Sequence, residues 1–168
     1  MKCIASNAQK ETTKTIHSSR GIILKENKIL LTYSNHFKDY TSPGGQQEDN
    51  ESLIETLKRE LKEEIGVTIL DYEELGYILE YYQNGDNFEV KKNYYYLIKS
   101  YRNGNHSRRT DEINYGMESR WVTLDEAILQ NELQIKNRIT QGLTHLNPFI
   151  TTMEREISIY KYIKEFLL

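Results

Sequence analysis

Acidic side chains gather in one short stretch of the chain, GGQQEDNESLIETLKRELKEEIGV, which runs from Gly44 to Val67. Glu60, Glu63 and Glu64 have i, i+3 and i+4 spacing, so a helix would bring them to one side. Carboxylates crowded in this way repel one another and resist losing water unless a cation neutralises them. Oxygen ligands suit Mg²⁺ or Mn²⁺ better than zinc, and such ions often also take oxygens from a substrate phosphate. The spacing therefore predicts a divalent-metal site suited to phosphate chemistry.

A helix over about residues 52–65 is predicted to carry these acids. Ser52 and Glu55 have the spacing of a capping box, and Gly66 stands where a glycine often ends a helix. The segment Ser42-Pro43-Gly44-Gly45 leads the chain into this helix. A free backbone carbonyl at one of its glycines would be one more oxygen ligand for the ion.

The periodicity of this helix turns two acids toward the core. The apolar residues form one stripe centred on Leu57, which also contains Leu53, Ile54, Leu61 and Ile65. Glu64 lies about 20° and Glu60 about 60° from the centre of that stripe. The alternative is that KRELKEE is a solvated face with ion pairs among its charges, which is the commonest role of such a run. The inward position of Glu64 favours the metal site.

The stretch also follows a longer pattern. Its order is Gly45, five residues, Glu51, seven residues, Arg59-Glu60-Leu61, one residue, Glu63-Glu64, one residue and Gly66-Val67. This pattern resembles the Nudix box at every defined position. At residue frequencies of about 7%, seven fixed identities would coincide on the order of once in a million such chains. The lead-in Pro43, Glu48 and the segment that begins at Trp121 are also similar to family members.

The resemblance implies a fold and a reaction. The expected fold is an α/β/α sandwich around a mixed β-sheet. The chain length predicts a single domain over residues 15–168. Ile and Tyr at helical spacing predict a C-terminal helix at 151–167, which lies outside the resemblance. Residues 1–14 are polar and aperiodic, which predicts a flexible N-terminal tail. The reaction implied is hydrolysis of a nucleoside diphosphate linked to another group.

The resemblance also implies roles for the metal-binding residues. Glu60 and Glu64 would bind Mg²⁺ directly, with Mn²⁺ as the alternative ion, and Glu63 would support the metal or the attacking water. The Gly44 carbonyl would join the ligands. The metal would polarise the bridging phosphates and neutralise the leaving phosphate.

Other site residues follow from the same resemblance. Glu51 and Arg59 would pair and hold the helix and the preceding loop in register. The general base is either a box glutamate or an acid on a distal loop. The distal candidates are Asp111, Glu112 and Glu118, of which we prefer Glu118.

Substrate contacts are less strongly indicated by the residues. Arg20 occupies a position where similar proteins often keep an arginine near the phosphates, although an edge-strand charge facing water is an equal alternative. Tyr81 and Tyr82 are candidates to stack a base, as are Tyr94 and Tyr96, but strand tyrosines more often simply pack. Arg108 and Arg109 lie in a polar loop and would either close on phosphates or stay solvated.

The box says little about the particular substrate. The proline found some 16 residues past the box in many ADP-ribose hydrolases is absent, as are the extended signatures of NADH and coenzyme A hydrolases. A nucleoside triphosphate, normal or oxidised, cleaved to monophosphate and pyrophosphate is therefore the default prediction. The alternatives are a dinucleoside polyphosphate hydrolase, a nucleotide-sugar hydrolase and a Nudix-fold sensor that binds a nucleotide without cleaving it.

Bulk properties limit the location and the partners. The chain has 168 residues, a net charge of −3 and a single cysteine, Cys3. No secretory signal or membrane-spanning run is evident, so we expect a cytoplasmic protein. The charge argues against a stable nucleic-acid complex and leaves a small-molecule nucleotide as the expected partner. The family resemblance allows a homodimer.

Composition and periodicity predict the remaining elements. We expect a hairpin of strands at 16–24 and 28–33, two long strands at 67–82 and 89–101 joined by a turn at 84–87, and a mobile loop at 102–115. A strand at 119–123 would lead into a helix at 124–131. Pro148 would lie in the connection before the C-terminal helix.

Overall fold

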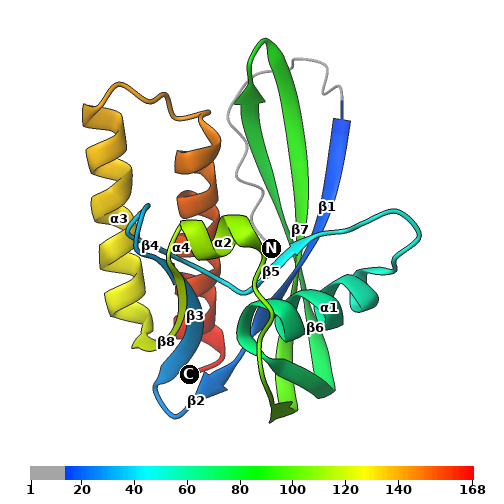
Figure 1. The fold of residues 1–168 in the computed structure, drawn as a ribbon. Helices are drawn as coiled ribbons and strands as arrows, with labels where there is room; N and C mark the ends of the chain where they lie inside the picture. Colours follow the sequence, from blue (N-terminus) through cyan, green and yellow to red (C-terminus); the bar gives the residue numbers. More distant parts are fainter. Residues whose placement is uncertain (1–13) are drawn as a thin grey trace.

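The computed structural model describes residues 14–168, so the predicted tail at residues 1–14 lies outside the described residues except where the first strand begins. Figure 1 shows the arrangement of the helices and strands. The elements in chain order are β1 (Lys14–Ile22), β2 (Leu24–Lys25), β3 (Lys28–Ser34), β4 (Asp39–Thr41), β5 (Gly44–Gln46), α1 (Leu53–Ile65), β6 (Val67–Asn84), β7 (Asn87–Asn103), α2 (Thr110–Asn114), β8 (Met117–Thr123), α3 (Leu124–Thr140) and α4 (Pro148–Phe166). Within residues 14–168, no helix has the length and apolar character needed to cross a membrane.

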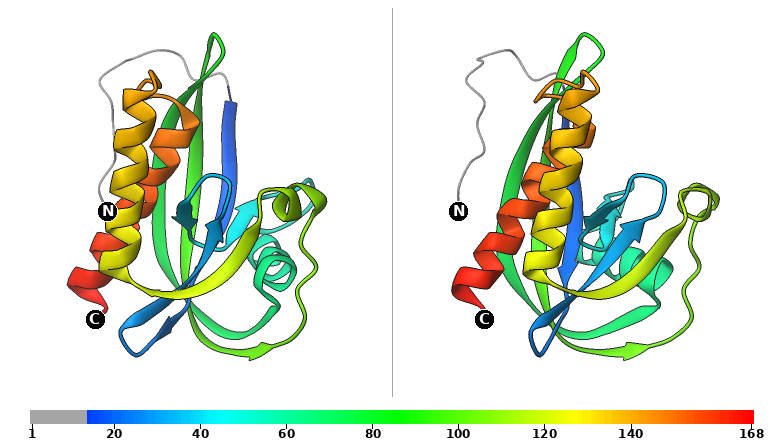
Figure 2. Two further views of the ribbon diagram at one scale, coloured as in Figure 1. Left: turned by 60° about the vertical axis from the view of Figure 1, so that its left-hand side comes forward. Right: turned by 90° about the vertical axis from the view of Figure 1, so that its left-hand side faces the viewer.

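The strands form two sheets between layers of helices. The first sheet has the order β5-β1-β7-β6 and is mixed, because β1 runs parallel to β7 while β5 and β6 run antiparallel to their neighbours. The second sheet is antiparallel, and in it β3 pairs with β2, β4 and β8. Helix α1 packs on β1, β5 and β6, whereas α3 and α4 pack on the other side (Figure 2). The predicted α/β/α sandwich around a mixed sheet is confirmed.

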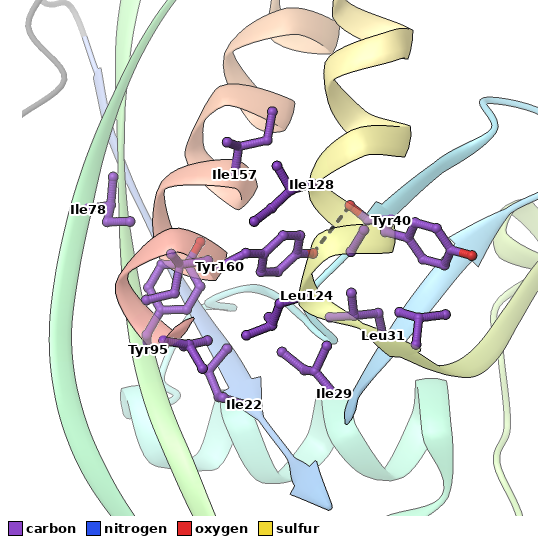
Figure 3. Packing of buried hydrophobic residues seen from close by; sticks show 14 residues of the cluster. Ile22, Ile29, Leu31, Tyr40, Ile78, Tyr95, Leu124, Ile128, Ile157 and Tyr160 are labelled. Atoms are coloured by element: carbon purple, nitrogen blue, oxygen red, sulfur yellow. Dashed lines mark hydrogen bonds between the residues drawn. The ribbon is translucent and has the colours of Figure 1, made fainter. Parts of the chain in front are cut away.

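Two apolar cores hold these layers together. The larger one lies between the sheets and the helices α3 and α4, and it includes Ile22, Tyr95, Leu124 and Tyr160 (Figure 3). The smaller core lies under α1 and includes Leu57 and Leu61, together with Ile23, Val67 and Tyr96. The acidic helix is thus anchored by its apolar stripe, as its periodicity predicted.

The predicted hairpin at 16–24 and 28–33 is only partly correct. Residues Lys14–Ile22 belong to the mixed sheet, and only Leu24–Lys25 pair with β3. The chain changes sheets at Ile23, and Ile22 and Ile23 are buried in different cores. Alternation alone does not show such a change, because both strand pieces are apolar on one face.

Other boundaries also differ from the predictions. The predicted loop at 102–115 contains the short helix α2, and α3 continues to Thr140 rather than ending near residue 131. Helix α4 begins at Pro148, which is its first residue and not part of the preceding connection. The fixed φ of proline suits a first helical turn, where its missing N–H is not needed.

Candidate active site

Helix α1 begins and ends at the predicted signals. The Ser52 side chain accepts a hydrogen bond from the backbone N–H of Glu55, and the Glu55 carboxylate accepts one from the N–H of Ser52, so the capping box is complete. Gly66 ends the helix with a φ of 70°. The helix buries two of its acids, with Glu60 exposing 2% and Glu64 exposing 9% of its surface. The inward position predicted for these two carboxylates is therefore confirmed.

Arg59 joins the helix to the loop before it. Its Nε and NH2 donate to the two carboxylate oxygens of Glu51 at 2.6 Å and 2.9 Å, a bidentate pair. Its NH1 donates to Glu60 Oε1 at 2.7 Å and lies 3.6 Å from Glu63 Oε2. The hydrogen bond from Arg59 lowers the pKa of Glu51 to about 2. The predicted pair of Glu51 and Arg59 is present and ties loop to helix.

Glu64 is a buried carboxylate that accepts a hydrogen bond from the backbone. The Gly44 N–H donates to its Oε2 at 3.0 Å. Burial raises the pKa of Glu64 to about 8, and the charges of Glu60 and Glu112 add to that effect, while Arg20 opposes it. An added positive charge at this place would favour the ionised form of Glu64.

The two glycines before α1 allow the loop to approach the acids. Gly44 has a φ of +139°, and a Cβ there would overlap the carbonyl oxygen of Ser19. A Cβ at Gly45 would overlap the Glu60 carboxyl group. Glycine at these positions therefore brings backbone groups close to both buried carboxylates.

The donor chemistry at this place fits a divalent cation. Among residues 14–168, no three His, Cys, Asp or Glu side chains lie together as a ready cluster of metal ligands. Glu60 faces Arg59, and Glu64 faces the Gly44 N–H. The available carboxylate and carbonyl groups are nevertheless all oxygens, and a hard cation would offset the burial that raises the pKa of Glu64.

Arg20 reaches the loop that carries the two glycines. Its NH1 donates to the Ser42 carbonyl at 3.1 Å and to the Gly44 carbonyl at 3.0 Å. Its Nε is buried without a hydrogen-bond partner. The structure thus places Arg20 beside Gly44 and Glu64, and the carbonyl predicted to bind metal is here an acceptor for Arg20.

The distal acids occupy different surroundings. Glu112, in α2, is 8% exposed, and its charge contributes to the raised pKa of Glu64. Glu118, in β8, has a side chain that is 47% exposed and accepts hydrogen bonds from Asn35 and Arg120. The side chain of Asp111 is 60% exposed. Of the three candidates, Glu112 is the buried one, and its charge acts on Glu64. Its two carboxylate oxygens face Arg109, whose backbone N–H donates at 2.8 Å and whose guanidinium lies 3.5 Å away. The sequence favours Glu118 instead.

A polar cleft of about 680 Å³ lies beside Glu60. It is lined by Gln46, Gln47, Glu48, Asp49, Glu60 and Arg109. Most of these residues directly follow the two glycines in the sequence, and this position could have identified them as candidates to line the site. Arg109 comes from the far end of the polar loop, and its proximity depends on how that loop folds. The cleft offers the Arg109 guanidinium and two side-chain amides to an anionic ligand, but its three acids would repel such a ligand unless a cation lay between them.

Tyr81 and Tyr82 are not brought to the acids. The Tyr82 hydroxyl donates to Glu89 at 2.7 Å, and the residue is 6% exposed. Tyr81 lines a separate small cavity between β6 and α4. Tyr81 pairs with Val90 of β7, and Arg20 pairs with Tyr95 of the same strand. Val90 and Tyr95 are five residues apart, which is about 17 Å along a strand. The structure gives these two tyrosines no contact with the cleft.

Together, a two-sheet sandwich, an acidic helix and a glycine loop at its start define a class of hydrolases that act on phosphoric anhydrides. Residues 15–143 match the NUDIX domain family. The chain therefore belongs to the Nudix hydrolase family.

Several known proteins are similar to this chain. The 8-oxo-dGTP diphosphatase of Buchnera aphidicola subsp. Schizaphis graminum is 33% identical over 110 residues, which are 63% of this chain and 75% of the relative. The crystal structure of the MutT protein from Bacillus halodurans has a TM-score of 0.55 at 21% identity and covers 68% of this chain and 72% of its own. The solution structure of the E. coli ORF135 protein has a TM-score of 0.53 at 19% identity, and the match covers 87% of this chain and 91% of that protein. Both solved structures resemble this chain in fold.

Proposed function

We propose that this protein hydrolyses a nucleoside triphosphate to the monophosphate and pyrophosphate, with an oxidised purine nucleotide as the first candidate substrate. The observation that carries the proposal is the pair of buried carboxylates, Glu60 and Glu64, beside the Gly44 loop, with Glu60 at the edge of an open polar cleft. The similarity to an 8-oxo-dGTP diphosphatase supports the choice of substrate.

The metal would be held by Glu60, Glu64 and the Gly44 carbonyl, with Mg²⁺ as the proposed ion and Mn²⁺ as the alternative. When bound, it would polarise phosphate oxygens and neutralise charge on the leaving pyrophosphate. Glu63, whose side chain is 31% exposed, would support the ion or its water. The bidentate pair of Glu51 and Arg59 would keep these groups in register.

Other residues of the chain would bind the substrate and move the proton. Arg109 lines the cleft and would contact a phosphate oxygen, and Arg20 would contribute positive charge from the other side of the loop. A water oxygen attacks phosphorus while the bond to the leaving phosphate oxygen breaks. Glu112 would accept the proton of that water at a carboxylate oxygen, because it is the buried distal acid and its charge acts on Glu64.

The first experiment is a substrate panel. Phosphate release, with pyrophosphatase added, is measured for normal and oxidised nucleoside triphosphates, nucleotide sugars, ADP-ribose and dinucleoside polyphosphates, in Mg²⁺ and in Mn²⁺. We expect turnover of a triphosphate that is lost in Glu64→Gln. Turnover only of a dinucleoside polyphosphate or a nucleotide sugar would replace the proposed substrate. Ligands that raise the melting temperature without any turnover would favour a sensor.

Replacing the distal acids separately tests the proton acceptor. Glu112→Gln is expected to lower kcat by about a hundredfold or more, because a positioned base contributes about 10²–10⁴-fold. Glu118→Gln is expected to stay within about twofold of the wild-type protein, since its carboxylate is bonded to Asn35 and Arg120. Steady-state kinetics of both variants over a range of pH make the comparison. A larger loss in Glu118→Gln would restore the assignment made from the sequence.

The location and the assembly remain proposals. We propose a cytoplasmic protein with a small-molecule nucleotide as its partner, in agreement with the net charge of −3 and the single cysteine. A flexible tail at residues 1–14 and a homodimer stay predictions. Limited proteolysis and analytical ultracentrifugation would check them.

A further inference from the structure

Helix α4 follows the segment that matches the family and carries buried charges. Arg155 and Glu156 are 1% and 0% exposed. Arg155 NH1 donates to Glu80 Oε2 at 2.7 Å and to Asn93 Oδ1 at 2.9 Å, and its NH2 donates to Glu156 Oε1 at 2.5 Å. This buried network joins α4 to strands β6 and β7.

The second oxygen of Glu156 leaves this network and holds the glycine loop. Glu156 Oε2 accepts hydrogen bonds from the Ser42 backbone N–H at 2.9 Å and from the Ser42 hydroxyl at 2.7 Å. Ser42 is 1% exposed, so water does not compete for these bonds. Two hydrogen bonds to one charged oxygen in such a place are stronger than bonds between neutral groups.

Ser42 is the first residue of a short segment that ends at Gly44. The Gly44 N–H donates to Glu64, and the Gly44 carbonyl accepts from Arg20. Between them, the Pro43 carbonyl accepts from the Gly21 N–H at 2.9 Å. The segment is thus held at one end by α4 and at the other by the acidic helix, with only Pro43 between the two held residues.

Stability alone does not explain the charges on α4. The helix already buries apolar side chains against the sheets, namely Ile150, Met153, Ile157, Ile159, Tyr160 and Ile163. A buried ion pair is often no more stabilising than well-packed apolar residues of similar volume. A carboxylate at position 156 does provide an acceptor for two donors of Ser42, which an apolar residue cannot do.

We propose that α4 positions the Gly44 carbonyl and amide of the active site through Glu156 and Ser42. Glu156 is accordingly a positioning residue that acts on the metal-binding loop without touching metal or substrate. This inference rests on the proposed function to the extent that Gly44 offers a metal ligand. Glu156 itself lies outside residues 15–143, the part of the chain that matches the family.

Ser42→Ala tests this role, with Thr152→Val as the matched control. Each variant removes one hydroxyl that donates to a carboxylate of the same network, Glu156 in the first case and Glu80 in the second. Only the first lies on the loop. Three quantities are measured for both: the melting temperature, the hydrogen exchange rate of the Gly44 amide by NMR, and the Kd for Mn²⁺ by electron paramagnetic resonance.

We expect similar small decreases in melting temperature for the two variants. Ser42→Ala should also raise the Gly44 exchange rate by about tenfold and the Kd for Mn²⁺ by about threefold or more, because a loop that keeps only its backbone hydrogen bond to Glu156 opens more often. Thr152→Val should leave both near the wild-type values. Equal Gly44 exchange rates and equal Kd values in the two variants would overturn the proposal.

Glu156→Gln provides a second variant with a larger expected effect. Glutamine presents an N–H₂ group either to Arg155 or to Ser42, both of which are donors, so one of the two contacts is lost. If Glu156→Gln does not fold, Ser42→Ala still decides the question. The exchange rate and Mn²⁺ binding require no turnover, so they separate a failure of this inference from a failure of the proposed function.

Discussion

Glu64→Gln is expected to stabilise the metal-free protein and, in the same variant, to lower turnover by about 10²–10³-fold. Burial raises the pKa of Glu64 to about 8 from an ordinary value of 4.5. Its folded-state pKa is above its unfolded value, so the stability from protonated Glu64 is fully present below about pH 4.5 and is lost as the pH rises to about 8. The loss of turnover follows because a neutral amide is a poor ligand for a hard cation and stabilises less charge.

Urea denaturation in the presence of EDTA, from pH 5 to pH 9, measures the stability effect. The free energy of unfolding of the wild-type protein should fall over this range, and at pH 9 the variant should be more stable by up to about 5 kcal/mol, at about 1.4 kcal/mol per pKa unit. Added Mg²⁺ should restore stability to the wild-type protein more than to the variant. The same pH slope in both proteins would show that Glu64 is not the group that titrates.

Arg155→Met is expected to cause a large loss of stability. The variant leaves the carboxylates of Glu80 and Glu156 buried without their cation, and breaking a buried pair in this way typically costs about 3–5 kcal/mol. For a protein of this size the melting temperature should fall by about 10 °C, at roughly 2–4 °C per kcal/mol. Thermal denaturation followed by circular dichroism makes the measurement.

Lys161→Met is the control for this loss. Lys161 lies on the same helix and pairs with Glu132, but the two side chains are 60% and 47% exposed. Exposed pairs contribute about 0–1 kcal/mol, so the melting temperature should barely change. Adding Glu80→Gln and Glu156→Gln to Arg155→Met should recover part of the lost stability, because unpaired charges are removed. A loss in Arg155→Met no larger than in the control would contradict the buried-pair argument.

The acidic helix could be predicted in detail because its signals are local. The capping box at Ser52, the terminal Gly66 and the apolar stripe lie within a few turns, and they also turned Glu60 and Glu64 inward. The pair of Glu51 and Arg59 is equally local, since eight residues separate them.

Contacts between distant parts of the chain could not be predicted in this way. The polar loop showed no periodicity, so nothing in the sequence distinguished the buried Glu112 from the exposed Glu118. Tyr81 and Tyr82 have a composition that suits base stacking, but the strand register takes them away from the cleft. The contact of Ser42 with Glu156 depends on how α4 packs, which the spacing of its apolar residues does not specify.

The bond between Ser42 and Glu156 also has a consequence for synthesis of the chain. It joins residues 114 positions apart, and contacts over such separations form only after a long stretch of chain has closed. The acidic helix leaves the ribosome well before Glu156 has been made. A chain that stops before α4 would therefore carry the whole Nudix box without the carboxylate that holds Ser42. Such a fragment would keep the family motif but would lack the contact that we propose positions the Gly44 loop.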